Sequence, residues 1–192
     1  MNEPVIFGTA FEALFLKTLP PPSAALRETL AKEGVRLDRP LQVAYPLETW
    51  RRCLSAVAKD QFAHLAPEQA FSALGTAMTR GFRHTLMGSA TFPLIKLMGL
   101  ERSLMRSTNN SRTMSNAYVS TATRLDQQRV SLEQALLPEF VGRVRPATPA
   151  EAWLFRGTIE GLFLALGAAS YELNVEVGDE TRHQVTLVVR WS

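Results

Sequence analysis

Two segments near the carboxyl terminus alternate regularly between apolar and polar residues, and this pattern limits the fold more than any other feature. The apolar members of residues 171–177 are Tyr171, Leu173, Val175 and Val177. Those of residues 185–191 are Val185, Leu187, Val189 and Trp191. Because successive side chains of a strand point to opposite faces, each segment has one apolar face. The pattern predicts two strands that cover a core, joined by a turn at residues 178–180.

A long helix is predicted directly before these strands, over residues 150–167. Its apolar residues recur at helical spacing and are Leu154, Ile159, Leu162, Phe163 and Leu166. Gly157 and Gly161 lie about one turn apart, and a glycine inside a helix costs up to about 1 kcal/mol relative to alanine. We therefore expect a gain in packing at both glycines, which would let the helix lie close against the sheet.

A second hairpin is predicted upstream of this helix. Its strands would cover residues 113–124 and 130–136, with a turn at residues 126–128. Residues 107–111 form a polar break before the hairpin, and residues 138–149 form a connection after it. The carboxyl-terminal part thus has the predicted order strand-strand-helix-strand-strand.

The first half of the chain is predicted to be helical. Apolar residues recur at helical spacing in residues 7–15, 24–33, 46–62 and 67–87. Ser23 is placed to cap the second of these helices, and Gly34 to end it. We expect Gly88 to end the fourth helix and Pro93 to lie at or near the start of a fifth.

The fourth helix carries two neighbouring stripes of side chains. One is bulky and consists of Phe71, Leu74, Met78 and Phe82. The other is small and consists of Ala70, Ala73, Ala77, Gly81 and Thr85. Small residues let another helix approach closely, and they equally leave room for a bound apolar molecule. The sequence leaves both interpretations open.

Together these elements predict an α+β fold, with residues 1–192 as a single domain. Residues 1–107 would form a helical half that packs on an antiparallel sheet, which residues 112–192 form together with the long helix. Cys53 is the only cysteine. No internal disulfide is therefore expected, and a reducing cytoplasm is the expected location. The longest weakly polar stretch, residues 88–95, is far shorter than the roughly 20 residues of a membrane-spanning helix, so integral membrane association is not expected.

Positive charge is concentrated in residues 80–112. The formal net charge is +3, and this segment contains six Lys or Arg but one acid, Glu101. The concentration is typical of a solvated helix face, and it would also suit an acidic protein partner or anionic lipid headgroups. Nucleic acid is not expected as a partner, because no basic helix with interleaved aromatic residues and no nucleic-acid-binding motif accompanies the charge.

The residue types that catalysis requires are scattered. The three histidines, His64, His84 and His183, lie in no metal-ligand spacing, and phosphate-binding loops and a nucleophile elbow are absent. Cys53 is predicted beside an apolar stripe, as a buried and inert thiol. His84 could face a cavity or lie partly exposed beside Arg80 and Arg83. The pattern favours binding over catalysis and predicts no metal site.

Several segments together resemble a family of myxobacterial paralogues of unknown function. They are residues 7–15, 45–50, 70–75, 81–88 and 185–191, so the likeness spans nearly the whole chain. The order of elements is also distantly similar to three groups of domains: haem nitric-oxide-binding domains, small-molecule-binding domains related to vinyl reductases, and TRAPP vesicle-tethering subunits. This resemblance implies a ligand enclosed between a helical layer and an antiparallel sheet.

The haem-binding relatives use a proximal histidine and a Tyr-x-Ser-x-Arg motif that holds the haem propionates. Tyr118 and Ser120 match the first two positions of that motif, but Ala122 stands where the arginine would be. His84 is the only upstream histidine at a comparable distance. The missing guanidinium removes the bidentate contacts that hold a carboxylate.

We therefore predict a non-enzymatic cytoplasmic sensor that binds a small apolar molecule or an acyl group and signals to a protein partner, without a cofactor. The predicted ligand-binding residues are Phe71, Met78, Phe82, His84, Tyr118, Leu154, Gly157, Gly161, Phe163 and Trp191. The alternative is an interaction domain with a solid core, acting through its surface or as a homodimer by sheet-edge pairing. A haem-based gas sensor is a third hypothesis.

Overall fold

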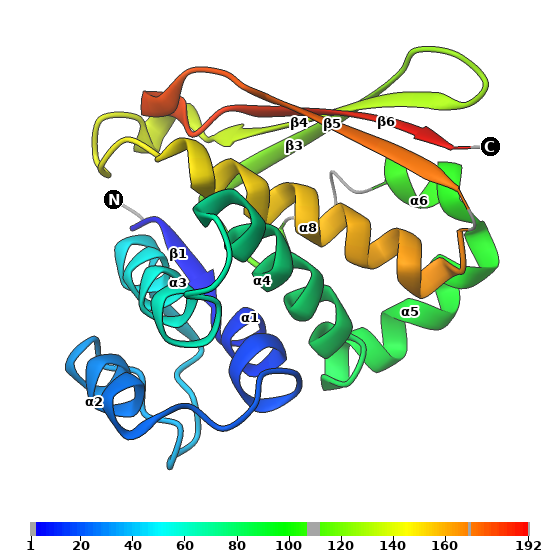
Figure 1. Cartoon of the computed structure of the whole chain (residues 1–192). Helices are drawn as coiled ribbons and strands as arrows, with labels where there is room; N and C mark the ends of the chain where they lie inside the picture. The colour runs from blue at the N-terminus through cyan, green and yellow to red at the C-terminus, as the bar shows by residue number, and fades with distance from the viewer. Residues whose placement is uncertain (1–2, 107–111, 169, 192) are drawn as a thin grey trace.

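The computed structural model describes residues 3–106, 112–168 and 170–191. Figure 1 shows a layer of helices against one face of an antiparallel sheet, with α8 (Pro149–Leu166) lying between them. This is the predicted α+β class. The predicted polar break at residues 107–111 lies outside the described residues. No helix among the described residues combines the length and the apolar character needed to cross a membrane.

The amino-terminal part consists of short strands and helices. Its elements are β1 (Val5–Phe7), α1 (Gly8–Phe11), the π-helical η1 (Glu12–Leu16), α2 (Ala24–Lys32), β2 (Ala44–Pro46) and α3 (Leu47–Gln61). The hydroxyl of Ser23 accepts a hydrogen bond from the amide of Leu26 and caps α2, as predicted. Gly34 follows that helix with φ +81°, which is the left-handed conformation that glycine adopts readily.

The next three helices differ from the prediction. α4 (Pro67–Phe82) ends before Gly88, because a turn follows it and the Thr85 hydroxyl caps a new helix by accepting from the Gly88 amide at 3.0 Å. That helix, α5 (Leu86–Met98), contains Pro93 in its interior. Gly99, with φ +78°, separates α5 from α6 (Leu100–Met105). Gly88 therefore lies in the first turn of a helix and does not end one.

The main sheet has the strand order β3-β4-β6-β5. Its antiparallel strands are β3 (Tyr118–Arg124), β4 (Arg129–Leu136), β5 (Tyr171–Val177) and β6 (Val185–Trp191). Short 3-10 turns, η2 (Pro138–Phe140) and η3 (Glu180–Arg182), lie in two connections. The apolar residues that alternate along β6 face the core, as predicted: Val185, Leu187 and Val189 are buried.

β3 begins five residues later than predicted. Residues 114–116 are held by β1 instead, because the Phe7 amide donates to the Met114 carbonyl at 2.9 Å and the Ser115 hydroxyl donates to the Val5 carbonyl at 2.7 Å. The Asn116 side chain completes this contact by accepting from the Val5 amide. The chain therefore crosses from the helical layer to the sheet just before Tyr118.

α8 packs against both layers, and its two glycines face the helices. A Cβ atom on Gly157 would overlap the carbonyl oxygen of Ser72 in α4, and one on Gly161 would lie 2.7 Å from Cβ of Thr79. The expectation that these glycines lie against the sheet is therefore wrong. Bulky side chains, Phe155, Ile159 and Phe163, cover the sheet instead. The side of α8 that carries the two glycines is the side that another helix backbone can approach most closely.

Candidate functional site

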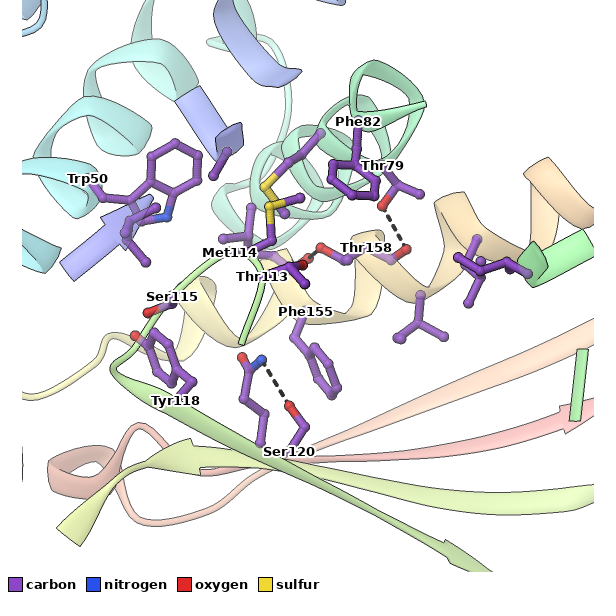
Figure 2. A pocket seen from close by; sticks show the side chains of 18 of the residues that line it. Trp50, Thr79, Phe82, Thr113, Met114, Ser115, Tyr118, Ser120, Phe155 and Thr158 are labelled. Atoms are coloured by element: carbon purple, nitrogen blue, oxygen red, sulfur yellow. Dashed lines mark hydrogen bonds between the residues drawn. The ribbon is translucent and has the colours of Figure 1, made fainter. Parts of the chain in front are cut away.

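A cavity of about 200 Å³ lies between the helical layer and the sheet. α4, α5 and α8 supply much of its wall, and β1, α3 and the start of β3 contribute further residues. Most of the lining is apolar and includes Ile6, Trp50, Phe82, Phe92, Phe155 and Leu162. Figure 2 shows Trp50 and Phe82 on the helical side and Phe155 pointing from α8 toward the sheet. The cavity occupies the interlayer position in which a ligand was expected.

Neutral polar side chains lie on the sheet side of this cavity. Tyr118 and Ser120 come from β3, and Gln134 comes from the facing strand β4. The Gln134 amide donates to the Ser120 hydroxyl over 3.5 Å (Figure 2). None of the residues that line the cavity is ionised at neutral pH. The cavity thus offers apolar surface together with uncharged hydrogen-bonding groups.

Tyr118 connects the cavity to His183, which follows η3 in the turn between β5 and β6. The Tyr118 hydroxyl lies 3.1 Å from Nδ1 of His183, and Nε2 of His183 lies 2.8 Å from the Arg145 carbonyl oxygen. Because a carbonyl oxygen only accepts, Nε2 carries the proton and Nδ1 accepts from the tyrosine hydroxyl. Burial lowers the pKa of His183 and raises the pKa of Tyr118. Both side chains are therefore neutral at about pH 7.

A buried salt-bridge cluster around Arg51 of α3 lies beside this pair. The guanidinium binds the Glu151 carboxylate through two hydrogen bonds of 3.1 and 2.6 Å, and it binds Glu48 at 2.9 Å. It also donates to the carbonyl oxygens of Arg145 and Pro146, each at 2.8 Å. Burial acts to raise the pKa of Glu151, but the hydrogen bonds from Arg51 hold it below its ordinary value. The cluster joins α3 to the start of α8, next to a second cavity of about 80 Å³.

Four of the predicted ligand-binding residues line the larger cavity: Met78, Phe82, Tyr118 and Leu154. Two others are aromatic residues that fill the core elsewhere. Phe71 lies in the core of the helical layer, and Phe163 packs on Tyr171 with 4.8 Å between ring centroids. Their apolar character predicted burial correctly but did not distinguish a cavity wall from a filled core.

The remaining four predicted residues also lie away from this cavity. Gly157 and Gly161 are in the contact between α8 and α4. Trp191 ends β6 and packs at the edge of the cluster between α8 and the sheet. His84 is exposed in the turn after α4, because that helix ends at Phe82 and does not continue through this residue.

The small-residue stripe of α4 does not form the cavity either. A Cβ atom on Gly81 would overlap the carbonyl oxygen of Ala13 in η1, so this part of the stripe is filled by backbone. α4 also approaches α8 closely at Gly75, which lies outside the stripe, where an added Cβ would lie 2.6 Å from the Thr158 amide nitrogen. Close packing against backbone is therefore the role of Gly81 and Gly75.

The residues that line the cavity do not fit haem. None of them is a histidine that could bind iron, and none is a lysine or arginine that could pair with a propionate. Ala122, at the arginine position of the motif, packs against the apolar cluster between α8 and the sheet. His64 and His84 are exposed, and both ring nitrogens of His183 are in hydrogen-bonding contacts with protein atoms.

Other reactive groups of the described residues are not gathered into a site. Among the residues that the structure describes, no group of three or more His, Cys, Asp or Glu is placed to hold a metal ion. Cys53 is buried, and burial raises the pKa of its thiol to about 12. A thiol in that state is a poor nucleophile at neutral pH.

Solved structures of H-NOX proteins have a fold similar to that of this chain. An H-NOX protein from S. oneidensis in the Fe(II) ligation state aligns with a TM-score of 0.65 and 12% identity, over 97% of this chain and 96% of that one. An H-NOX protein from S. oneidensis in the Fe(II)NO ligation state aligns with a TM-score of 0.64 and 11% identity, over 97% of this chain and 99% of that one. An oxygen-binding H-NOX domain related to soluble guanylate cyclases aligns with a TM-score of 0.58 and 15% identity, over 87% and 84%.

These similarities extend over nearly the whole chain and show a shared fold. No curated protein matches the sequence. A family model does match it, from residue 4 to residue 192, and that family is described as a protein of unknown function. The chain therefore belongs to the DUF2378 family.

Proposed function

We propose that this protein is a non-enzymatic sensor that binds a small, uncharged and mainly apolar molecule between its helical layer and its sheet. The observation that supports this function most is the cavity at that position, with its apolar wall and neutral polar groups. An apolar cavity between two layers is a common form of ligand site. The similar H-NOX structures include an oxygen complex and an Fe(II)NO state, so the same layered fold serves as a small-molecule-binding domain there.

The size and charge of the cavity restrict the ligand class. A cavity of about 150 Å³ binds benzene in another protein, whereas drug-sized ligands occupy about 300–1,000 Å³. At about 200 Å³, this cavity suits a small ring compound or the end of an acyl group. An ionised carboxylate would lose its hydration here without gaining a cation, which is costly. The ligand is therefore neutral, and haem, with its propionates, is disfavoured.

The contact between Tyr118 and His183 could transmit ligand binding in the cavity to the turn between β5 and β6. Tyr118 lines the cavity and contacts His183, whose ring also binds the backbone beside the Arg51 cluster. A ligand that hydrogen-bonds to Tyr118 would compete with His183 and change the turn between β5 and β6. We infer that a cytoplasmic protein partner binds differently to the two conformations of this turn.

Native mass spectrometry of the purified protein, followed by organic extraction, tests the ligand. The expected result is a co-purifying neutral molecule that is lost in Leu162→Trp, because Leu162 lines the cavity. Leu166→Trp is the matched control, since residue 166 lies one turn further along α8 and does not line the cavity. A molecule retained equally by both variants would contradict the site.

The small cavity volume also favours the second candidate, an interaction domain without a ligand. In that case native mass spectrometry would find only the protein mass, and Leu162→Trp would stabilise the fold by filling space. Haem is distinguished separately by the absorption spectrum after expression with haem. A Soret band that depends on any of the three histidines would overturn the assignment of a neutral ligand.

A further inference from the structure

α5 exposes apolar side chains over one whole face. Leu86, Leu94 and Leu97 are 89%, 59% and 85% exposed, which is far more than leucine usually shows in a folded protein. The exposed members of this outer face are Leu86, Met87, Ala90, Pro93, Leu94 and Leu97. On a helix with 3.6 residues per turn these positions fall within an arc of about 120°. The outer face is therefore one continuous apolar stripe.

The opposite face of α5 is already occupied by the protein. Ile95 is buried and lines the cavity, together with Phe92. A helix that is apolar on both sides is normally covered on both sides, because its exposed carbon surface is unfavourable in water. Figure 1 shows α5 and α6 at one end of the molecule, with α2 at the other end and no described element outside α5. The outer face of α5 is thus apolar, yet none of the described elements packs on it.

Exposed cations lie on α5 and on the segments that flank it. They are Arg83 before α5, Lys96 on it, Arg102 on α6 and Arg106 just after α6. Among the described residues, none of these four forms a salt bridge. The one acid of residues 80–106 is Glu101, and it pairs with Arg124 at 3.1 Å. The segment that carries the apolar face is therefore positively charged, and its one acid is paired with an arginine of β3.

We propose that α5 docks this protein on an anionic membrane surface, with its outer face inserted at the headgroup level and the four cations paired with lipid phosphates. A helix with leucines on one side and lysine or arginine beside it is the usual form of an in-plane membrane anchor. The energetic centres of protein interfaces are instead enriched in Trp, Tyr and Arg and poor in Leu. The outer face contains no aromatic residue, so a lipid surface fits it better than an acidic protein does.

This docking does not depend on a ligand in the cavity, but α5 is common to both. Phe92 and Ile95 face the cavity from the helix whose other side meets the membrane. Insertion of α5 would therefore act on the cavity wall directly. The test below is independent of any ligand, so its failure would leave the proposed sensor function standing.

Co-sedimentation of the full chain with lipid vesicles tests the proposal. The protein is expected to pellet with vesicles that contain phosphatidylglycerol, to pellet much less with phosphatidylcholine alone, and to dissociate as salt is raised. Leu94→Asn combined with Leu97→Asn should weaken binding by at least about tenfold, because two leucines lose their buried surface in the bilayer. The matched control is Leu164→Asn on α8, where the leucine is 55% exposed but lies outside this face.

Charge-reversal variants test the contribution of the cations to membrane binding. Lys96→Glu with Arg106→Glu should abolish the preference for anionic vesicles, whereas Arg27→Glu on α2, at the opposite end of the molecule, should not. Thermal unfolding should be unchanged in all these variants, since each side chain is exposed. Equal pelleting of the leucine variant and its control would overturn the proposal. A dimer that the leucine variant converts to monomer, without vesicle binding, would overturn it in favour of self-association.

A fluorescent label gives an independent reading. Cys53 is buried with a raised pKa, so a cysteine introduced at position 97 would be the reactive thiol of the folded protein. An environment-sensitive dye on Leu97→Cys should shift to the blue on anionic vesicles, while the same dye on Val43→Cys, at an 88% exposed site, should not. A dye at position 97 that stays fully hydrated on vesicles that pellet the protein would exclude insertion of α5.

Discussion

Replacing Gly157 by alanine tests the packing of α8 on α4, which positions one wall of the cavity. The added Cβ would overlap the carbonyl oxygen of Ser72 and would lie 2.8 Å from its Cα atom. These are backbone atoms, so no side-chain rotation can relieve the contact. The two helices would have to move apart, and this would weaken two cross-helix hydrogen bonds: from Thr76 to the Gly157 carbonyl at 3.1 Å, and from Thr79 to the Thr158 carbonyl at 2.9 Å.

The expected loss of stability follows from these contacts. Overpacking of a tight contact costs about 1–3 kcal/mol, and loss of each of the two hydrogen bonds costs about 1 kcal/mol. The higher helix propensity of alanine offsets about 1 kcal/mol of this loss. Gly157→Ala is therefore expected to decrease the free energy of unfolding by about 2–4 kcal/mol. For a chain of this length that corresponds to a decrease in Tm of about 4–16 °C.

Urea unfolding followed by circular dichroism measures this change. Helix propensity alone predicts the opposite sign, so a Gly157→Ala variant more stable than the parent would refute the packing argument. Gly161→Ala should cost less, because its Cβ would meet the side chain of Thr79 and not a carbonyl group. Gly34→Ala is the steric control: nothing lies within 4 Å of its Cβ position, and only its φ of +81° opposes alanine.

Three further variants and one chemical probe test the region beside the cavity. Arg51→Met should lower the free energy of unfolding by about 3–5 kcal/mol, measured in urea, because it leaves the Glu151 carboxylate buried without its partner. The pKa of Glu151 is lowered from 4.5, so its contribution to the free energy of unfolding is present above that pH and is lost as the pH falls below it. Glu151→Gln should therefore make the free energy of unfolding less dependent on pH in that acid range. The pKa of His183 is lowered from 6.5, so the unfolded chain binds more protons below that pH and stability falls as the pH decreases through it; His183→Phe should remove this slope. Cys53 should react with a thiol reagent in urea but not in the native protein, and native reactivity equal to that of free cysteine would contradict its burial.

The strands and the long helix were predictable because their signals are local. The alternation along residues 185–191 and the end of α8 at Gly167 depend on neighbours in the sequence. The boundary between α4 and α5 was missed, because the apolar residues keep their helical spacing across the turn at residues 83–85. The orientation of Gly157 was also missed. α8 is apolar on more than one side, and the sequence does not say which side meets a helix and which meets the sheet.

The cavity was predictable as a location but not as a set of residues. Met78, Phe82, Tyr118 and Leu154 line it as predicted, yet Trp50, from α3, was missed as a lining residue. The pattern of α3 predicts that its stripe is buried, but only the tertiary fold decides that Trp50 borders an empty space. Arg51 was missed as well. One local signal for its cluster existed, since Thr148 and Glu151 have the spacing of a capping box, and the Thr148 amide does donate to Glu151 at 2.8 Å.

The shared fold and the altered interior together argue for a different ligand class from haem. The chain aligns with H-NOX structures over nearly its full length at 11% and 12% identity, so the layers are retained while most side chains differ. A ligand is selected by the side chains that face it and not by strand order. An arginine in place of Ala122 would put a charge against the apolar cluster of α8 and the sheet, and it would supply no iron ligand, because no histidine lines the cavity. Binding of haem would thus require at least two coordinated changes, whereas the small neutral ligand that we propose would require none.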